Sequence, residues 1–396
     1  MLSPPHIEVT EPARRFPPCG VDNTRPSHHL NDSKTLFGNP WLSFRFQSLF
    51  QWASAVCVIQ FFLSRSPRIP KNIKSLVPKQ TVTWGAHLGN ESSAKATWLG
   101  HACYFVELPT PPGAARGVRI IFDPVFSNRC SPSKWLGPAR FTDAPCEVED
   151  IPAVDAIVLS VFRSSDACAS TDIPTLRALI ANPSSSARIF VALNNAAYLS
   201  GALDTPHHRF HELDWWDERF LRVALPSSVG GPAVNAEVRI SCTPSQHVSG
   251  RTAFDRWHAL WAAWVVDDLH SQKKLYFAGD TGYRTVRDGE DEEKVPVCPA
   301  FAEVGERFGG VDVALLPIGA YAPRAMWSNL HASPADAVRM FKDVRAKKAL
   351  AMHWGTWVLT SEPVLEPPEL LRKECEVAGV DVDEFLVPAL GETVMF

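Results

Sequence analysis

Four apolar segments of this chain each run into a histidine or an aspartate and then into a polar or glycine-containing turn. The residues at these ends are His101, His247, Asp280 and His353. In layered α/β proteins, polar side chains at strand ends converge from distant parts of the chain. The pattern therefore predicts a sheet-based domain in which these four side chains approach one another.

Strand-like and helix-like segments alternate over the C-terminal three quarters of the chain. Strands are predicted at 96–108, 118–123, 156–160, 188–193, 237–242, 274–279, 311–317 and 349–354. Helices are predicted at 173–181, 299–308, 334–347 and 367–377. The best helix start is Ser333 followed by Pro334, because serine caps helices well and proline suits the first turn. Short strands mixed with helices indicate a layered α/β fold.

The side chains at the four strand ends suit zinc, which binds histidine nitrogen and carboxylate oxygen. A single histidine at a strand end is more often a hydrogen-bonded structural residue, but four such ends in one chain favour a metal site. The nine cysteines are scattered without a Cys-x-x-Cys pair. We therefore expect neither a disulfide framework nor a cysteine-based zinc site.

The charge balance argues against nucleic acid as a partner. Lys and Arg number 39 and Asp and Glu 43, which gives a net charge of -4, whereas affinity for a phosphate backbone needs an excess of cations. The 396 residues, 45% of them apolar, suffice for one large core or two ordinary ones. Composition leaves the oligomeric state open.

Residues 1–80 form an N-terminal extension of different character. The first forty residues show no apolar period, so we expect them to be disordered or loosely attached. An uncharged apolar run at 46–64 is long enough to cross a bilayer. Its glutamines, serines and cationic flanks favour a helix at a membrane surface over a true span. A helix packed on the domain is the alternative.

These features predict an intracellular protein, peripheral to a mitochondrial or endomembrane surface. No secretory signal is expected, because the apolar run lies far from the first residue and no small-residue cleavage pattern follows it. The basic N-terminus is compatible with a mitochondrial address, but its acidic residues argue against an ordinary transit peptide.

A series of short motifs spans residues 80–396. They include TWLGHA at 97–102, ELDWW at 212–216, CTPSQH at 242–247, FAGDTGY at 277–283, PIGAY at 317–321 and HWGT at 353–356. These motifs resemble the metallo-β-lactamase superfamily and, more specifically, its N-acylphosphatidylethanolamine-hydrolysing phospholipase D group. The resemblance implies an αββα four-layer sandwich at 81–396. Residues 1–80 are not matched by it.

The resemblance also implies a reaction and a set of metal ligands. Members of the group are two-zinc hydrolases that split an N-acylated phospholipid into N-acylethanolamine and phosphatidic acid. By motif position, His247 binds one zinc, His353 binds the other and Asp280 bridges them. Two-metal catalysis lowers the pKa of water, polarises the phosphoryl oxygen and neutralises the leaving oxygen.

Four further residues receive roles from the same resemblance. His331 lies beside the substrate phosphate, as a proton donor or anion-stabilising group. Tyr321 and Arg324 are candidates for shaping the substrate pocket, although packing is the more ordinary role for both. His101 is expected to be structural or to support a ligand rather than to bind metal itself.

One motif of the family is missing from this chain. After the strand at 156–160 the family places H-x-H-x-D-H, which supplies two ligands to each metal. Here the corresponding positions hold Val161, Arg163, Ser165 and Asp166, and no other register restores the histidines.

Three ligands then remain, namely His247, Asp280 and His353. Two histidines and one carboxylate can hold a single ion with open positions, while an inward-pointing Arg163 would repel a second cation. Asp166 is a weak candidate for a further ligand, and so is Cys168. We expect at most one zinc at this site rather than two.

Three explanations of the altered loop remain open. The protein is a working hydrolase with a rebuilt one-metal site, acting on a phosphodiester lipid or on a different small ester. Alternatively, it is a pseudoenzyme that binds a lipid or a partner without turnover. In the third explanation, a misplaced splice junction or local frameshift hides a normal motif, since the neighbouring blocks are all intact.

Overall fold

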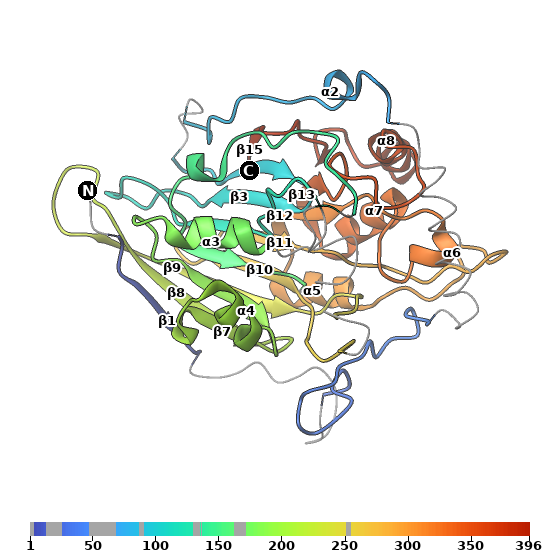
Figure 1. Ribbon diagram of the computed structural model, residues 1–396, viewed down its shortest axis with the longest axis horizontal. Helices are drawn as coiled ribbons and strands as arrows, with labels where there is room; N and C mark the ends of the chain where they lie inside the picture. Colours follow the sequence, from blue (N-terminus) through green and yellow to red (C-terminus); the bar gives the residue numbers. More distant parts are fainter. Residues whose placement is uncertain are drawn as a thin grey trace.

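Two β-sheets lie face to face and carry helices on their outer surfaces (Figure 1). The computed structural model describes residues 4–12, 26–46, 69–86, 91–129, 135, 137–161, 172–250 and 255–396. This arrangement confirms the αββα four-layer sandwich that the sequence predicts. The loop residues Arg163, Ser165, Asp166 and Cys168 lie outside the described residues.

The larger sheet has eight strands. In spatial order they are β1 (Ile7–Thr10), β8 (Glu218–Leu225), β9 (Val234–Thr243), β10 (Ala263–Asp268), β11 (Lys274–Phe277), β12 (Val311–Pro317), β13 (Ala346–Met352) and β14 (Phe385–Leu386). Pairing is antiparallel from β1 to β11 and parallel from β11 to β14. The parallel half brings the carboxyl ends of β11 and β13 to one edge.

The smaller sheet has seven strands and packs against the larger one. In spatial order they are β15 (Thr393–Met395), β2 (Lys95–Gly100), β3 (Cys103–Glu107), β4 (Arg119–Phe122), β5 (Ala156–Val158), β6 (Arg188–Ala192) and β7 (Phe210–Leu213). Contacts such as Phe122 with Phe277, whose ring centroids lie 4.8 Å apart, join the two sheets. The main apolar core therefore lies between them.

Helices cover the outer face of each sheet. On the larger sheet lie α5 (Ala300–Phe308), α7 (Pro334–Asp343) and α8 (Glu366–Ala378), and on the smaller one α3 (Ile173–Ala181) and α4 (Ala196–Leu203). The short helices are α2 (Ile73–Leu76), α6 (Arg324–Trp327), η1 (Val148–Asp150) and η2 (His207–Arg209). A second apolar core fills the space beneath α3 and α4.

Two sequence expectations need correction in detail. The run at 96–108 is not one strand but the hairpin β2–β3, because Gly100 (φ 102°) and His101 (φ 50°) turn the chain between the strands. The helix expected at 334–347 begins as predicted, with Ser333 accepting a hydrogen bond from the Asp336 backbone N–H. It ends at Asp343, and β13 already begins at Ala346, because the chain must return to the sheet.

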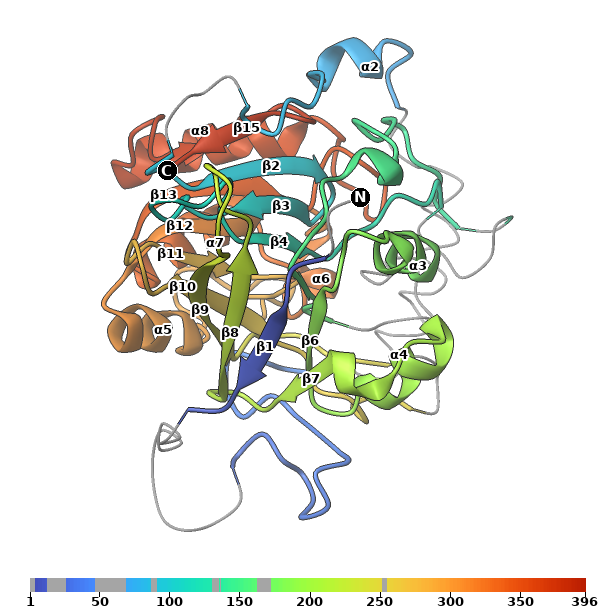
Figure 2. The ribbon, with the colours of Figure 1, turned by 90° about the vertical axis from the view of Figure 1, so that its left-hand side faces the viewer.

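The described parts of the N-terminal extension pack against the domain, contrary to the expectation of loose attachment. Strand β1 pairs with β8 along its whole length (Figure 2), and Phe37 is fully buried. The sequence did not reveal this packing, because a short strand and a single buried side chain produce no periodic pattern of apolar residues. Of the apolar run at 46–64, only Phe46 lies within the described residues. None of the helices in the described ranges is long and apolar enough to cross a bilayer.

Candidate metal centre

The strand ends identified in the sequence meet at one edge of the sandwich. Asp280 follows β11 and His353 follows β13, and both strands pair in parallel with β12. His101 comes from the other sheet, in the turn between β2 and β3. His247 follows β9, and His331 lies just before α7. All five side chains are buried.

Three of these residues form a tight group of potential ligands. One donor atom each of His101, Asp280 and His353 lies within 4.8 Å of the other two. The rings of His101 and His353 are 4.1 Å apart between centroids, and His353 Nε2 is 3.0 Å from Asp280 Oδ1. The cluster therefore brings two nitrogens and one carboxylate oxygen close enough to share an ion.

Two further histidines adjoin this group. The ring centroid of His331 lies 5.2 Å from that of His353 and 5.5 Å from that of His247. His247 Nδ1 is 2.8 Å from the Val248 carbonyl oxygen. When that nitrogen carries the proton, Nε2 is the unprotonated nitrogen of His247, the form that binds metal ions. The structure thus brings the four strand-end residues His101, His247, Asp280 and His353 into one neighbourhood, together with His331.

The pKa shifts of Asp280 and His101 favour the protonation states that metal binding requires. Burial opposes ionisation of Asp280, but the neighbouring imidazoles, His353 foremost, hold its pKa well below the ordinary aspartate value. Burial, reinforced by His353, places the pKa of His101 well below that of an ordinary histidine. At neutral pH the carboxylate is therefore ionised and the His101 imidazole neutral, and both forms bind metal ions.

The donor set fits a divalent ion. Nε2 of His101 is buried without a hydrogen-bond partner among the described residues, and such an atom is costly unless a ligand satisfies it. Two imidazoles and a carboxylate match the preferences of zinc. The strand-end pattern predicts that His101 lies close to Asp280 and His353, whereas the family resemblance gives it a structural or ligand-supporting role; the structure places it within the tight group.

A second buried acidic side chain, Asp123, helps to fix the strand end that precedes Asp280. It accepts hydrogen bonds from the backbone N–H (2.8 Å) and hydroxyl (2.5 Å) of Ser160. Burial raises the pKa of Asp123 to about 8, an effect that the Ser160 hydroxyl opposes. A Cβ on Gly279 would lie 2.3 Å from the Ser160 Cβ. The contact fixes the strand end that leads into Asp280 against the start of the altered loop.

Sequence reasoning did not single out Asp123 as a site residue. The available signal was an aspartate that directly follows a strand-like apolar run, the same pattern that identified Asp280. Val161, the first altered position of the motif, is buried directly after Ser160.

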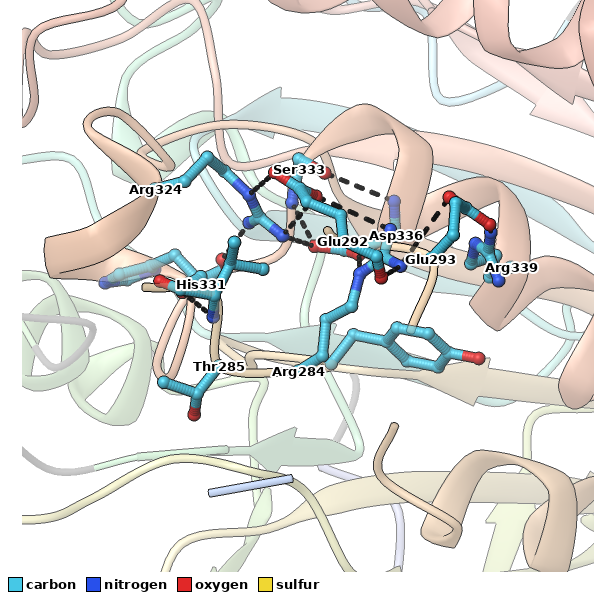
Figure 3. A network of polar contacts seen from close by, with 12 residues as sticks. Arg284, Thr285, Glu292, Glu293, Arg324, His331, Ser333, Asp336 and Arg339 are labelled. Atoms are coloured by element: carbon cyan, nitrogen blue, oxygen red, sulfur yellow. Dashed lines mark hydrogen bonds and ion pairs between the residues drawn. The ribbon is translucent and has the colours of Figure 1, made fainter. Parts of the chain in front are cut away.

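Tyr321 and Arg324 take part in hydrogen-bonded packing. The Tyr321 hydroxyl donates to Glu366 Oε1 at 2.5 Å. The guanidinium of Arg324 donates to Asp336 Oδ2 (2.7 Å) and contacts Glu292 at 3.2 Å, and its Nη1 reaches the His331 carbonyl oxygen at 3.5 Å (Figure 3). Arg324 therefore holds the backbone of His331 in place within an ion-pair network.

A small pocket lies beside the cluster, and its lining surface is about equally polar and apolar. His101 and His353 belong to this lining, and neither Tyr321 nor Arg324 contributes to it. The other lining residues are Phe141, Gly319, Ala320, Trp354, Gly355, Trp357, Val358, Leu359, Thr360, Glu362, Val364 and Pro367. The aromatic and aliphatic side chains among them offer contacts to an apolar group next to the two histidines.

The sequence matches known proteins over most of its length. A sequence model described as the β-lactamase superfamily domain matches residues 118–354. The N-acyl-phosphatidylethanolamine-hydrolyzing phospholipase D 1 of Caenorhabditis elegans is 31% identical over 334 residues, which cover 82% of each chain. The mitochondrial N-acyl-phosphatidylethanolamine-hydrolyzing phospholipase D of Saccharomyces cerevisiae is 29% identical over 91% of this chain and 75% of the relative.

Solved structures resemble the chain more distantly. Isothiocyanate hydrolase from Delia radicum gut bacteria shares 20% sequence identity with a TM-score of 0.49, over 76% of this chain and 99% of that chain.

Proposed function

The chain belongs to the β-lactamase superfamily and, within it, to the family of N-acyl-phosphatidylethanolamine-hydrolysing phospholipases D, and from this membership we propose that it is a metal-dependent phosphodiester hydrolase. The observation that carries the proposal is the buried cluster of His101, Asp280 and His353, whose donor atoms lie within 4.8 Å of one another. Two of its members, His101 and His353, line the pocket beside it.

We propose that this centre holds one zinc ion. Asp280 and His353 supply two ligands, and the distances favour His101 over His247 for the third. The family motif that would complete a second site is replaced at Val161, Arg163, Ser165 and Asp166. A bound zinc supplies Lewis acidity, which polarises a phosphoryl oxygen and lowers the pKa of water.

The protein's own residues supply orientation and a proton. His331, next to His353, is the candidate to donate a proton to the leaving oxygen or to stabilise the phosphate anion. Arg324 holds the His331 carbonyl, and the contact between Asp123 and Ser160 supports the strand end that precedes Asp280.

The proposed substrate is a phosphodiester of an N-acylated phospholipid. The names of the worm and yeast relatives specify this class for those proteins. In this chain Trp354, Trp357 and Leu359 give the pocket apolar side chains that the end of an acyl chain can contact. The apolar run at 46–64 and its cationic flank favour recruitment to a membrane surface. The yeast relative's mitochondrial name supports a mitochondrial membrane as that surface.

The altered loop favours a second candidate, a lipid-binding protein without turnover. Both candidates need the same pocket, so turnover itself must be measured. The full chain is equilibrated with excess Zn²⁺, freed of loosely bound metal and given N-acylphosphatidylethanolamine in mixed micelles. Zinc-dependent release of N-acylethanolamine and phosphatidic acid, lost in Asp280→Asn and His331→Gln, supports the hydrolase. Saturable binding of the lipid without either product supports the binding protein and overturns the hydrolase.

A further inference from the structure

A second group of potential metal ligands lies away from the catalytic cluster and shares no residue with it. His28 and His29 come from the N-terminal extension, and Asp214 directly follows β7 at the edge of the smaller sheet. One donor atom from each of the three lies within 4.8 Å of the other two. The group joins two parts of the chain that are far apart in sequence.

The contacts within this group are close and buried. His28 Nε2 is 2.7 Å from Asp214 Oδ1, and His29 Nε2 is 2.9 Å from Asp214 Oδ2. The side chains of His28, His29 and Asp214 are 7%, 0% and 13% exposed. Each imidazole thus faces its own oxygen of a single carboxylate, with a narrow opening to solvent at the aspartate.

His29 keeps one buried polar atom that the carboxylate does not reach. Its Nε2 lies 2.9 Å from Asp214 Oδ2, whereas its Nδ1 is buried without a hydrogen-bond partner among the described residues. A buried nitrogen in this state carries a desolvation cost unless another group satisfies it.

The surroundings hold both rings in place before any ligand arrives. The His28 ring lies 4.2 Å from the Trp215 ring and 4.3 Å from that of His29, and His29 packs on Phe37 at 5.4 Å between centroids. A backbone bridge between His29 and Phe37 fixes the local hairpin. Rings fixed in this way lose little entropy on binding an ion.

The electrostatics suit a cation. The carboxylate of Asp214 contributes one negative charge toward a divalent ion, and it lies within 2.9 Å of a nitrogen of each histidine. Imidazole nitrogen with carboxylate oxygen is a donor set of zinc.

We propose that His28, His29 and Asp214 form a second, structural zinc site that fastens the N-terminal extension to the hydrolase domain. The remaining coordination position faces the opening at Asp214 and is filled by water. An ion at this position bonds to both parts of the chain, so its binding free energy stabilises their contact. The site takes no part in the hydrolysis.

The test uses the full-length Asp280→Asn variant, which removes a ligand of the catalytic centre and leaves the second group to be measured alone. The purified protein is stripped with a chelator and titrated with Zn²⁺. We expect one zinc per chain and a rise in the thermal unfolding temperature. Adding Asp214→Asn or His29→Gln should weaken this binding by roughly 10- to 100-fold or more and abolish the thermal shift. His270→Gln, at an exposed histidine, is the matched control and should change neither.

Far-UV circular dichroism verifies that each variant is folded. If Asp214→Asn fails to fold, His29→Gln alone decides the question. Zinc binding by Asp280→Asn that is unaffected by either substitution, or no zinc binding by that variant at all, overturns the proposal. Activity on the phospholipid is measured separately on the chain with an intact Asp280. A loss of zinc at the second site with turnover retained therefore leaves the proposed function untouched.

Discussion

The imidazole rings of His101 and His353 lie 4.1 Å apart, and the backbone N–H of His353 donates to the carbonyl oxygen of His101 at 2.9 Å. The two residues come from different sheets, so this contact ties the sheets together at the edge where the catalytic cluster lies. Both have left-handed backbones, with φ of 50° and 64°. Because one proposed ligand comes from each sheet, the geometry of the proposed metal centre depends on how the sheets pack.

The first prediction distinguishes the two histidines that compete for the third ligand position. His101→Gln should weaken zinc binding at the cluster by at least about tenfold, because it removes a nitrogen of the tight group. His247→Gln should weaken it less, because His247 lies outside that group. Zinc titration of both variants in an Asp214→Asn background measures the difference. A greater loss in His247→Gln would assign the position to His247 and refute the choice of His101.

The second prediction concerns the close contact between Gly279, which precedes Asp280, and Ser160. Gly279→Ala places a Cβ 2.3 Å from the Ser160 Cβ at a backbone φ of 60°, so overpacking adds to backbone strain. We expect a loss of about 3 kcal/mol in the free energy of unfolding, together with weaker zinc binding. Gly289→Ala is the control, with a φ of 80° and no atom within 4 Å. It should cost only about 1 kcal/mol. Urea unfolding measures both variants, and equal losses in the free energy of unfolding would contradict a tight contact between Gly279 and Ser160.

The third prediction restores the missing motif. Replacing Val161, Arg163 and Asp166 with histidine and Ser165 with aspartate recreates H-x-H-x-D-H after Ser160, which Asp123 already holds. We expect one additional zinc per chain and faster hydrolysis of the phospholipid. Arg163→Gln alone removes the positive charge without adding ligands and should gain no zinc. If the fourfold variant folds but binds no further zinc, positions 161–166 do not correspond in space to the metal-binding motif of the family.

The fourth prediction concerns stability against pH at the edge of the smaller sheet. Burial, with Arg188 and Arg219 nearby, lowers the pKa of His211 to about 4, compared with about 6.5 in the unfolded chain. Between these values the unfolded state binds the proton and the folded state does not, so stability falls as the pH drops from about 6.5 toward 4. The whole pKa shift corresponds to about 3 kcal/mol in the free energy of unfolding. Solvent screening at this half-buried ring reduces the contribution to roughly 1–2 kcal/mol.

Urea unfolding at several pH values checks the contribution of His211. In His211→Gln the free energy of unfolding should fall by roughly 1–2 kcal/mol less between pH 6.5 and 4 than in the unmodified protein. His270→Gln, at an exposed ring, should decline like the unmodified protein. Parallel declines in all three proteins would show that His211 is protonated equally in the folded and unfolded states.

Much of the fold followed from local sequence patterns. The segment 311–317 was predicted as a strand and is β12, and the helix start at Ser333 was recognised from its cap. The convergence of Asp280 and His353 followed from their positions at strand ends. These features depend on a few neighbouring residues, which the sequence displays directly.

The features that were missed depend on contacts between distant segments. For His101 the sequence predicts proximity to the other strand ends but not its distance from Asp280 and His353, because a turn residue gives no information on how closely the opposite sheet approaches. The docking of the N-terminal extension through His28 and Phe37 rests on single anchors that produce no periodic pattern. The buried Asp123 was overlooked for a related reason, since its importance comes from the Ser160 contact across two strands.

The number of zinc ions at the catalytic cluster tests the account most directly. The measurement is elemental analysis of the full-length Asp214→Asn variant, in which the proposed second site is disabled, after equilibration with Zn²⁺ and removal of loosely bound metal. The account predicts one zinc per chain, lost when Asp280→Asn is added. Two zinc ions per chain, or one that remains in the double variant, would contradict it.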